Sequence, residues 1–397
     1  MTASQNARAG AVPRVAEDVL PGHPDRLADA VAERLVDAAV AIDPRALVGV
    51  EVAVFRGGVT VTGRIAAGGR RTPHAPLAAA IPEDACILEP YRAAGYRDAW
   101  ALRPEGFAGP GAREPGRVGR ILLDIEYGPL DDEESAIRGV SDDQNVVVGY
   151  ALANEATGWL PPEAFAVRRL REALFRLREQ HPQELGPDGK VLIRLLEQGG
   201  RFQWDVCNVA IQHAPGVGFE RLHRLVLPAL EGQLADLDAA LPGLGATWSP
   251  DRVRLNGGGD FSCGGPHGDN GLSGKKLVVD HYGPGAPIGG GALCGKDPHK
   301  VDRAGALRAR QLAVRLVRDS GAGEATVRLG FLPGLSEPAW LEAQVDGVWW
   351  DADRVASAIH VPDLSLNGTV RDLELTSVRW ADVAARGYFG RGWAWER

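Results

Sequence analysis

Two glycine-rich stretches of the chain contain most of the side chains that would bind an anion. They span residues 256–276 and 289–303, and lysine is scarce elsewhere in this arginine-rich sequence. The two stretches contain four lysines, Lys275, Lys276, Lys296 and Lys300. Glycines allow backbone amides to approach a ligand closely, as they do at phosphate sites. One lysine alone would fit a solvated loop, whereas four among glycines favour a phosphate-binding site.

A second group of reactive side chains stands at the start of an expected helix, where residues 22–26 have the sequence Gly-His-Pro-Asp-Arg. A helix N-terminus favours anions, and His23 adds a hydrogen-bond donor. Asp25 is suited to a metal ion that bridges phosphate oxygens. The alternative is that Asp25 only caps the helix, and the pentapeptide alone does not decide between the two.

The glycines do not match a dinucleotide-binding fingerprint, because no strand–turn–helix unit of the right length surrounds them. The remaining elements alternate between helices and strands with hairpins, which favours an α+β fold. We expect helices at 24–42, 163–180, 221–237 and 302–318, the third with a kink at Pro228. We expect a hairpin over 47–65 and strands at 120–126, 191–196, 204–213, 252–255 and 325–332, with a surface loop at 105–117.

Composition limits the class of protein. A chain of 397 residues has room for two or three domains, and 45% hydrophobic with 24% charged residues is typical of globular proteins. The formal net charge of −8 argues against non-specific binding to nucleic acid. No apolar run is long enough to span a membrane. Four widely spaced cysteines without a CxxC pair favour a reducing cytoplasm.

Taken together, the motifs resemble those of S-adenosylmethionine synthetases (methionine adenosyltransferases), and the chain resembles a divergent member of that family. The resemblance rests on residues 22–25, 43–44, 143–144, 149–151, 187–190, 212–213, 264–276, 289–303, 337–338 and 389–391. It implies three similar α+β domains around a pseudo-threefold axis, with mixed sheets and helices on the outer face. It also implies a homodimer or tetramer with active sites at the subunit interface.

The resemblance also predicts the division of the chain. We expect a disordered tail at 1–13, an N-terminal domain at 14–128 and a mobile active-site loop at 129–141, which is acidic and lacks a periodic pattern. A central domain at 142–264 and a C-terminal domain at 265–397 would follow.

The implied reaction is attack of the methionine sulfur on C5′ of ATP, with release of phosphate and pyrophosphate. The thioether has no proton to lose, so no general base is required. The anionic leaving group calls for cations that are already in place. By resemblance, the side chains that contact the triphosphate are His23, Lys190, Lys275, Lys276 and Lys296, of which His23, Lys190 and Lys296 would be catalytic.

The resemblance assigns the other ligands too. Asp25 and Asp302 would hold Mg²⁺, two ions in all, and Glu51 matches a potassium-site glutamate unless it is an ordinary strand residue. The remaining ATP site would comprise Asp188 at the ribose, Phe261 on the adenine, Ala292 near the nucleotide, and Asp260 and Asp269. The thioether amino acid would lie among Arg64, Tyr127, Asp143, Asp269 and Lys300.

Several of these positions depart from the family pattern. Arg64 replaces a glutamate that binds the methionine ammonium group, Tyr127 replaces a glutamine, and Asp260 replaces an arginine. Pro333 stands where an aliphatic residue is usual. Arg26 replaces a lysine and Lys275 replaces an arginine, so both positions keep their charge. Because Arg64 and Asp260 reverse sign in opposite senses, they would be able to pair with each other.

The altered positions leave three alternatives to methionine adenosylation. The same chemistry could act on a different thioether, because the changes gather on the amino acid side. The chain could also be a non-catalytic or regulatory paralogue that binds a nucleotide, or a tripolyphosphatase that performs only the second half-reaction.

Overall fold

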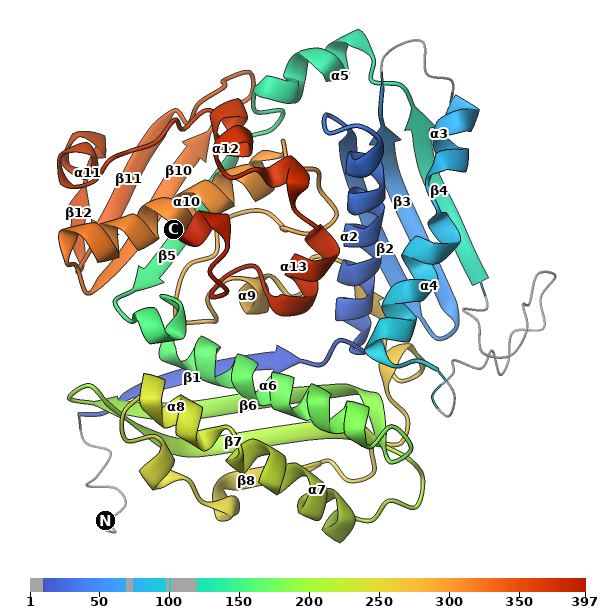
Figure 1. Ribbon diagram of the computed structural model, residues 1–397, viewed down its shortest axis with the longest axis vertical. Helices are drawn as coiled ribbons and strands as arrows, with labels where there is room; N and C mark the ends of the chain where they lie inside the picture. The colour runs from blue at the N-terminus through green and yellow to red at the C-terminus, as the bar shows by residue number, and fades with distance from the viewer. Residues whose placement is uncertain (1–9, 69–73, 98–99, 101–119) are drawn as a thin grey trace.

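The computed structural model describes residues 10–68, 74–97, 100 and 120–397 (Figure 1). The expected loop at 105–117 and most of the expected N-terminal tail lie outside the described residues. Three sheets of four strands each lie around the middle of the molecule, where the helix α13 (Trp380–Arg386) is found. Each sheet has one long helix on one face, so the α+β class and the threefold arrangement are confirmed.

The first sheet has the strand order β4-β3-β2-β9. Its strands are β2 (Leu47–Phe55), β3 (Gly58–Ala66), β4 (Arg120–Gly128) and β9 (Gly271–Leu272), with helices α2 (Pro24–Ile42), α3 (His74–Ala80) and α4 (Glu83–Ala94). Strand β3 runs antiparallel to β2 and parallel to β4, so the sheet is mixed.

The second sheet has the order β1-β6-β7-β8. It contains β1 (Val12–Val19), β6 (Leu185–Gln198), β7 (Arg201–His213) and β8 (Val253–Leu255), with α6 (Pro162–Gln180), α7 (Phe219–Glu231) and α8 (Leu234–Ala240). It is also mixed, because β7 and β8 are parallel while the other pairs are antiparallel.

The third sheet has the order β12-β11-β10-β5, and its pairs are all antiparallel. Its strands are β5 (Asn145–Leu152), β10 (Glu324–Phe331), β11 (Trp340–Val345) and β12 (Val348–Trp350), with α10 (Val301–Ser320), α11 (Ala352–Ala358) and α12 (Leu366–Asp372). Two short helices, α5 (Asp132–Ala136) and α9 (Leu277–Asp280), lie between the sheets in sequence.

The sheets exchange strands across the domain boundaries expected from the sequence. Strand β1 precedes the first sheet in sequence but pairs with β6, and it begins at Val12, inside the segment expected to be a tail. Strand β9 returns from the C-terminal part of the chain to pair with β2. The boundaries themselves stay a prediction, because a strand exchange does not say which parts move or fold together.

The expected helix at 24–42 is confirmed as α2, and its sequence explains its position. Pro24 occupies the first turn, where its missing N–H costs no hydrogen bond. Leu27, Val31 and Leu35 are fully buried along one face, as their helical spacing requires. The helix therefore lies against its sheet with its N-terminus fixed at His23.

Other expectations need correction. The helix expected at 221–237 is two helices, because α7 contains Pro228 and ends at Glu231 before α8 begins. The acidic segment at 129–141 contains the helix α5, which a capping box at Asp131 begins. Strands β1, β5 and β11 were not expected. None of the helices in the described ranges has the length and apolar character to cross a membrane.

The edge of β2 that faces away from β3, part of which pairs with β9, brings the two glycine-rich stretches together. Ser273 donates its backbone N–H to Val52 O, and Gly295 O accepts from Val50 N, both at 2.9 Å. Residues two apart on a strand are separated by about 7 Å. The loop that ends in Lys276 and the loop that contains Lys296 are therefore neighbours on one strand edge.

Candidate functional site

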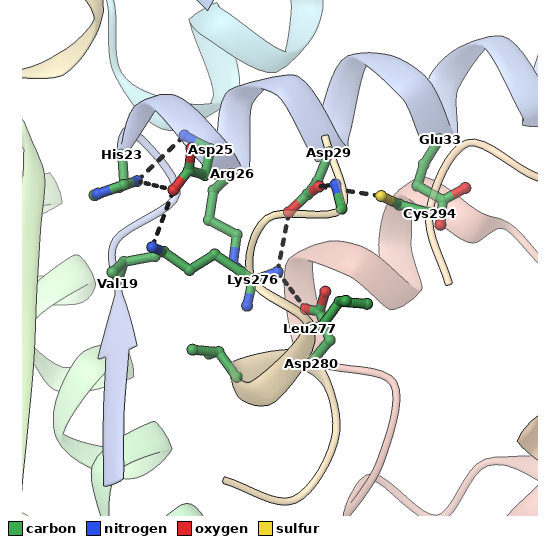
Figure 2. A network of polar contacts seen from close by, with 12 residues as sticks. Val19, His23, Asp25, Arg26, Asp29, Glu33, Lys276, Leu277, Asp280 and Cys294 are labelled. Carbon is green, nitrogen blue, oxygen red and sulfur yellow. Dashed lines mark hydrogen bonds and ion pairs between the residues drawn. The ribbon is translucent and has the colours of Figure 1, made fainter. Parts of the chain in front are cut away.

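His23 is the N-cap of α2 and is buried (Figure 2). Its Nδ1 accepts the backbone N–H of Asp25 at 3.2 Å. Burial, together with the charges of Lys190 and Lys276, lowers the pKa of His23 to about 3. A neutral imidazole whose Nδ1 is an acceptor carries its proton on Nε2. His23 is thus a neutral hydrogen-bond donor among cations.

Asp25 is the centre of the cation group at this helix start. Its carboxylate lies 2.9 Å from Lys276 Nζ and 3.8 Å from Lys275 Nζ, and it accepts the backbone N–H of Leu272 at 3.1 Å. The hydrogen bonds and charges around it lower the pKa of Asp25, against the opposing effect of burial. The Asp25 side chain is 2% exposed, whereas that of Lys275 is 48% exposed. The structure therefore brings His23, Asp25, Lys275 and Lys276 together.

Asp188 connects this group to the segment at 264–268. Its Oδ2 accepts the backbone N–H of Gly265 at 2.7 Å, while Oδ1 is buried with no hydrogen-bond partner among the described residues. Burial raises the pKa of Asp188 to about 6. An unpaired buried acceptor is suited to a ligand hydroxyl group. Lys190 follows two residues later on β6 and is exposed.

Phe261 and Asp260 lie beside the end of β7. The backbone N–H of Phe261 donates to His213 Nε2 at 3.1 Å, and Asp260 lies 3.3 Å from the same nitrogen. The side chains of this segment line an open hollow of about 430 Å³ together with Asn208 and Asn256. Phe261 is half-buried, so one face of its ring is available for stacking.

Lys296 and Asp302 form a second charged group. Lys296 Nζ lies 3.0 Å from one carboxylate oxygen of Asp302, and Asn145 donates to the other at 2.7 Å. Gly291 passes so close that a Cβ there would lie 1.5 Å from Asp302 Oδ1. Only glycine permits this approach. Ala292 continues this loop, and its Cβ would lie 2.9 Å from a Cβ on Gly274.

Asp29, one turn beyond Asp25 on α2, ties the two lysine loops to the same helix (Figure 2). Its Oδ1 accepts from the backbone N–H of Gly274 at 2.8 Å and from Cys294 Sγ at 3.1 Å. Its Oδ2 accepts from Arg26 at 3.2 Å, and Arg26 also pairs with Asp280. Burial and the neighbouring Asp280 raise the pKa of Asp29 to about 7.

The described residues contain no group of three or more His, Cys, Asp or Glu side chains arranged to hold a metal ion. Single carboxylates at Asp25 and Asp302 fit Mg²⁺ that takes its other ligands from phosphate oxygens and water. Both carboxylates accept from ammonium groups and N–H donors, the surroundings of an oxygen acceptor. Glu51 lies exposed on β2, paired with Thr62 on β3, and one carboxylate alone does not define a potassium site.

Arg64 lies in a row of paired residues across the first sheet. Gly49 pairs with Arg64 on one side and with Lys296 on the other, and Arg64 pairs in turn with Glu126. Residues paired in this way point to the same face of a sheet. Arg64 and Lys296 therefore share a face, with a residue that lacks a side chain between them.

Arg64 is held by acidic partners from its own sheet and from α5. Its guanidinium donates to both carboxylate oxygens of Glu134, one of them at 2.8 Å, and lies 3.2 Å from Glu126. The hydrogen bond with Glu134 raises the pKa of Arg64, and the same contact lowers the pKa of Glu134. The expected pairing of Arg64 with Asp260 is wrong within the chain, because Asp260 instead contacts His213 and Ser262.

The structure does not bring Tyr127 together with Arg64. Tyr127 pairs with Ile65, so it lies on the opposite face of the sheet, and it is 6% exposed in the core. Its hydroxyl contacts Glu83, and burial is the main cause that raises its pKa. Tyr127 therefore packs against the helices and does not line the face that carries Arg64 and Lys296.

The other expected amino acid residues lie at two places. Lys300 begins α10 and pairs with Asp142, the residue before the exposed Asp143. Asp269 is exposed, and its charge contributes to the raised pKa of Asp188, so it lies near the group at the helix start. Lys300 thus contacts the residue before Asp143 and not Asp143 itself, and the charge of Asp269 acts on Asp188.

Four residues with direct contacts to the site were missed from the sequence. They are Asp29, Glu134, Asp142 and Asn145. Two of them had a signal in the sequence. Asp29 follows Asp25 by one helical turn, and Asp142 forms an acidic doublet with Asp143 directly before Gln144. Glu134 had none, because its partner Arg64 lies 70 residues away in sequence.

Comparison with known proteins bears directly on this geometry. The family models described as the N-terminal and C-terminal domains of S-adenosylmethionine synthetase match residues 13–82 and 263–397. An S-adenosylmethionine synthase of Wolinella succinogenes is 32% identical over 391 residues, which cover 96% of this chain and 94% of the relative. One from Nocardia farcinica is 33% identical over 392 residues, or 94% of this chain and 92% of the relative.

Among solved structures, an unusual S-adenosylmethionine synthetase from Campylobacter jejuni aligns with a TM-score of 0.78. The alignment covers 97% of this chain and 96% of that chain at 24% identity. At this level of identity the likeness shows a shared fold.

Proposed function

Because the chain belongs to the S-adenosylmethionine synthetase family, we propose that it transfers the adenosyl group of ATP to the sulfur of L-methionine. A sulfur lone pair forms the S–C5′ bond while the C5′–O bond breaks, and its electron pair leaves with the triphosphate. Water then cleaves the triphosphate to phosphate and pyrophosphate. The product sulfur is cationic, and no proton is removed from the thioether.

The observation that carries this proposal is the group of neutral His23, Lys275 and Lys276 around one buried carboxylate at the start of α2. Donors that are fixed before the reaction stabilise a leaving anion without reorganisation. Lys190 and Lys296 would add charge from β6 and from the second glycine-rich loop. Asp188 would accept a ribose hydroxyl, and Phe261 would stack on the adenine.

Mg²⁺ held by Asp25 and Asp302 would neutralise phosphate oxygens as negative charge develops on the leaving group. The two carboxylates lie beside Lys276 and Lys296, so each proposed metal ligand has next to it a cation that would contact the triphosphate. Glu51, exposed on β2, would be the ligand for K⁺.

The chain would act as a homodimer or tetramer with the active site at the interface. The first sheet exposes Phe55, Leu122 and Leu272 on one face, at 52%, 50% and 44%. Large apolar side chains gathered on one sheet face are typical of an association surface. Arg64 and Glu51 share that face. A cytoplasmic location suits four cysteines that are all free thiols.

A different thioether is the second candidate substrate, and Arg64 favours it. At this position the side chain is a cation, which would repel the ammonium group that the family's glutamate would bind, and Glu134 and Glu126 are its own partners. The reaction would be the same, with another molecule as nucleophile.

The test is incubation of the full chain with ATP, Mg²⁺, K⁺ and L-methionine, with mass spectrometry for the sulfonium and assays for phosphate and pyrophosphate. Equal amounts of sulfonium, phosphate and pyrophosphate are expected. Binding of ATP with no product from any thioether would overturn catalysis and favour a nucleotide-binding paralogue. Hydrolysis of added tripolyphosphate without a sulfonium would favour a tripolyphosphatase. Sedimentation velocity measures the oligomeric state.

A further inference from the structure

An apolar hollow opens beside Asn145, whose side chain donates to Asp302. Its volume is about 520 Å³, within the range of small-molecule pockets. It is lined by Gln144, Asn145, Val146, Gly289, Gly290, Phe331, Leu332 and Trp340. Gly289 and Gly290 belong to the second glycine-rich stretch, whereas Val146, Phe331, Leu332 and Trp340 were not assigned a role from the sequence.

One wall of the hollow belongs to the charged group described above. Asn145 donates to Asp302, which pairs with Lys296, and a Cβ on Gly290 would lie 2.7 Å from Asn145 Oδ1. The same wall continues to Gln144, which directly precedes β5 and whose backbone N–H donates to Asp143 Oδ1 at 2.7 Å. The hollow thus lies between the expected triphosphate end and the expected amino acid end of the site.

The opposite wall is apolar and partly open. Trp340, Leu332 and Val146 are 43%, 42% and 41% exposed. Trp340 lies across Gly330, its neighbour in the sheet, so closely that a Cβ there would be 2.0 Å from the indole ring. Because Gly330 has no side chain, the indole ring of Trp340 can lie against its backbone at the mouth of the hollow.

We propose that this hollow receives the substituent on the thioether sulfur and that Trp340 determines which thioethers are accepted. The inference rests on the proposed function, since it concerns the nucleophile of that reaction. An aromatic face attracts a cation, and the transfer converts a neutral sulfur into a sulfonium beside the hollow. The apolar walls have room for groups larger than methyl. The substrate class is an S-alkyl or S-benzyl thioether amino acid.

The experiment compares methionine with S-ethyl-homocysteine and S-benzyl-homocysteine, using sulfonium formation by the full-length wild type and Trp340→Leu. We expect the wild type to convert all three. Trp340→Leu should lower kcat/KM for the S-benzyl compound about tenfold relative to methionine. The rate at which Trp340→Leu hydrolyses added tripolyphosphate should stay within about twofold of the wild-type rate, because the residues proposed to contact the triphosphate are unchanged.

Two further variants separate the hollow from general damage. Trp349→Leu is the matched control, because Trp349 is 50% exposed on the same sheet and lines no part of the hollow. It should leave the S-benzyl to methionine ratio unchanged. Gly330→Ala keeps Trp340 but displaces its ring, so it should reproduce the loss of Trp340→Leu.

An unchanged S-benzyl to methionine ratio in Trp340→Leu would overturn the role of Trp340, and so would an equal loss in Trp349→Leu. A wild type that converts methionine but neither larger thioether would overturn the proposed substrate class while leaving the proposed function intact. Failure to form a sulfonium from any of the three compounds would overturn the proposed function itself.

Discussion

On the proposed phosphate side, backbone N–H donors hold the carboxylates in addition to ion pairs, whereas on the proposed amino acid side the charged side chains are held mainly by ion pairs. On the phosphate side, backbone N–H groups of Leu272, Gly274 and Gly265 donate to Asp25, Asp29 and Asp188. On the amino acid side, Arg64 pairs with Glu134 and Lys300 with Asp142.

The difference matters because the two kinds of contact tolerate substitution differently. A backbone N–H is present whatever residue supplies it, so a carboxylate that accepts it stays in place as long as the fold does. An ion pair requires both side chains, and a change in one partner alters the charge that a substrate meets. For this reason the chain can belong to the family and still have unusual residues on the amino acid side of the site.

The largest expected effect comes from a comparison of two substitutions, each of which replaces one carboxylate on one side of the site. Asp25→Asn should lower kcat about 100-fold or more, because it removes the proposed Mg²⁺ ligand and the partner that places Lys276. Asp143→Asn should instead raise KM for the thioether, by less than about tenfold, with kcat nearly unchanged. Steady-state release of phosphate from ATP measures both.

A similar loss of kcat in the two variants would contradict the division of the site. Circular dichroism and thermal unfolding serve as controls, since Asp25 is buried and accepts the N–H of Leu272. Asparagine keeps one oxygen acceptor at that place, so the fold should survive.

The pair of Arg64 and Glu134 gives a sharper test on the amino acid side. Arg64→Met and Glu134→Gln should each change KM for the thioether by about three- to tenfold and leave KM for ATP unchanged. Their side chains are 25% and 15% exposed, so their coupling in a double-mutant cycle of unfolding free energy should be about 1 kcal/mol or less. Chemical denaturation measures the coupling.

If Arg64→Met changed KM for ATP by as much as KM for the thioether, Arg64 would belong to the phosphate side. If the variant lost more than about 3 kcal/mol, the pair would be a buried structural bridge and not a specificity feature.

The sequence predicted the phosphate side in more detail than the amino acid side, and the same contacts explain why. A proline at a helix start, apolar residues at helical spacing and lysines among glycines are local patterns, and α2 with Asp25 follows from them. Asp302 and Lys296 also lie within one motif. These residues need no knowledge of distant parts of the chain to be picked out.

The missed features all depend on pairings that are distant in sequence. Glu134 meets Arg64 only because β3 and α5 come together, and Asn145 meets Asp302 across 157 positions. Strand β1 was missed because its alternation is weak and Pro13 interrupts it, and it pairs with β6 far along the chain. The face on which Tyr127 lies depends on the register of β4 against β3, which no local pattern specifies.

Two titrating groups of the phosphate side should affect stability in opposite directions. His23 has its pKa lowered to about 3, so between that value and about 6.5 the unfolded chain binds more protons and stability falls as the pH falls. Asp29 has its pKa raised to about 7, so the folded chain binds more protons and stability falls as the pH rises from about 4 to 7. Each slope is at most about 1.4 kcal/mol per pH unit.

His23→Gln should therefore lose less stability on acidification than the wild type, and Asp29→Asn should lose more. Thermal unfolding midpoints between pH 4.5 and 7 measure both slopes. Parallel curves for all three proteins would mean that neither buried group keeps its shifted pKa.

The smallest effect is expected at the cysteines of the phosphate side. Cys263 is exposed between Phe261 and Gly264, while Cys86, Cys207 and Cys294 are buried. Burial raises the pKa of each of the three buried thiols, which makes them poor nucleophiles. A thiol reagent should therefore modify one cysteine quickly in the native protein, and Cys263→Ser should abolish that reaction while changing kcat/KM by less than about twofold. A tenfold loss of kcat/KM in Cys263→Ser would show that the cysteine side chain, and not the backbone around it, supports this part of the nucleotide site. The contrast between the two sides of the site would then not hold at this position.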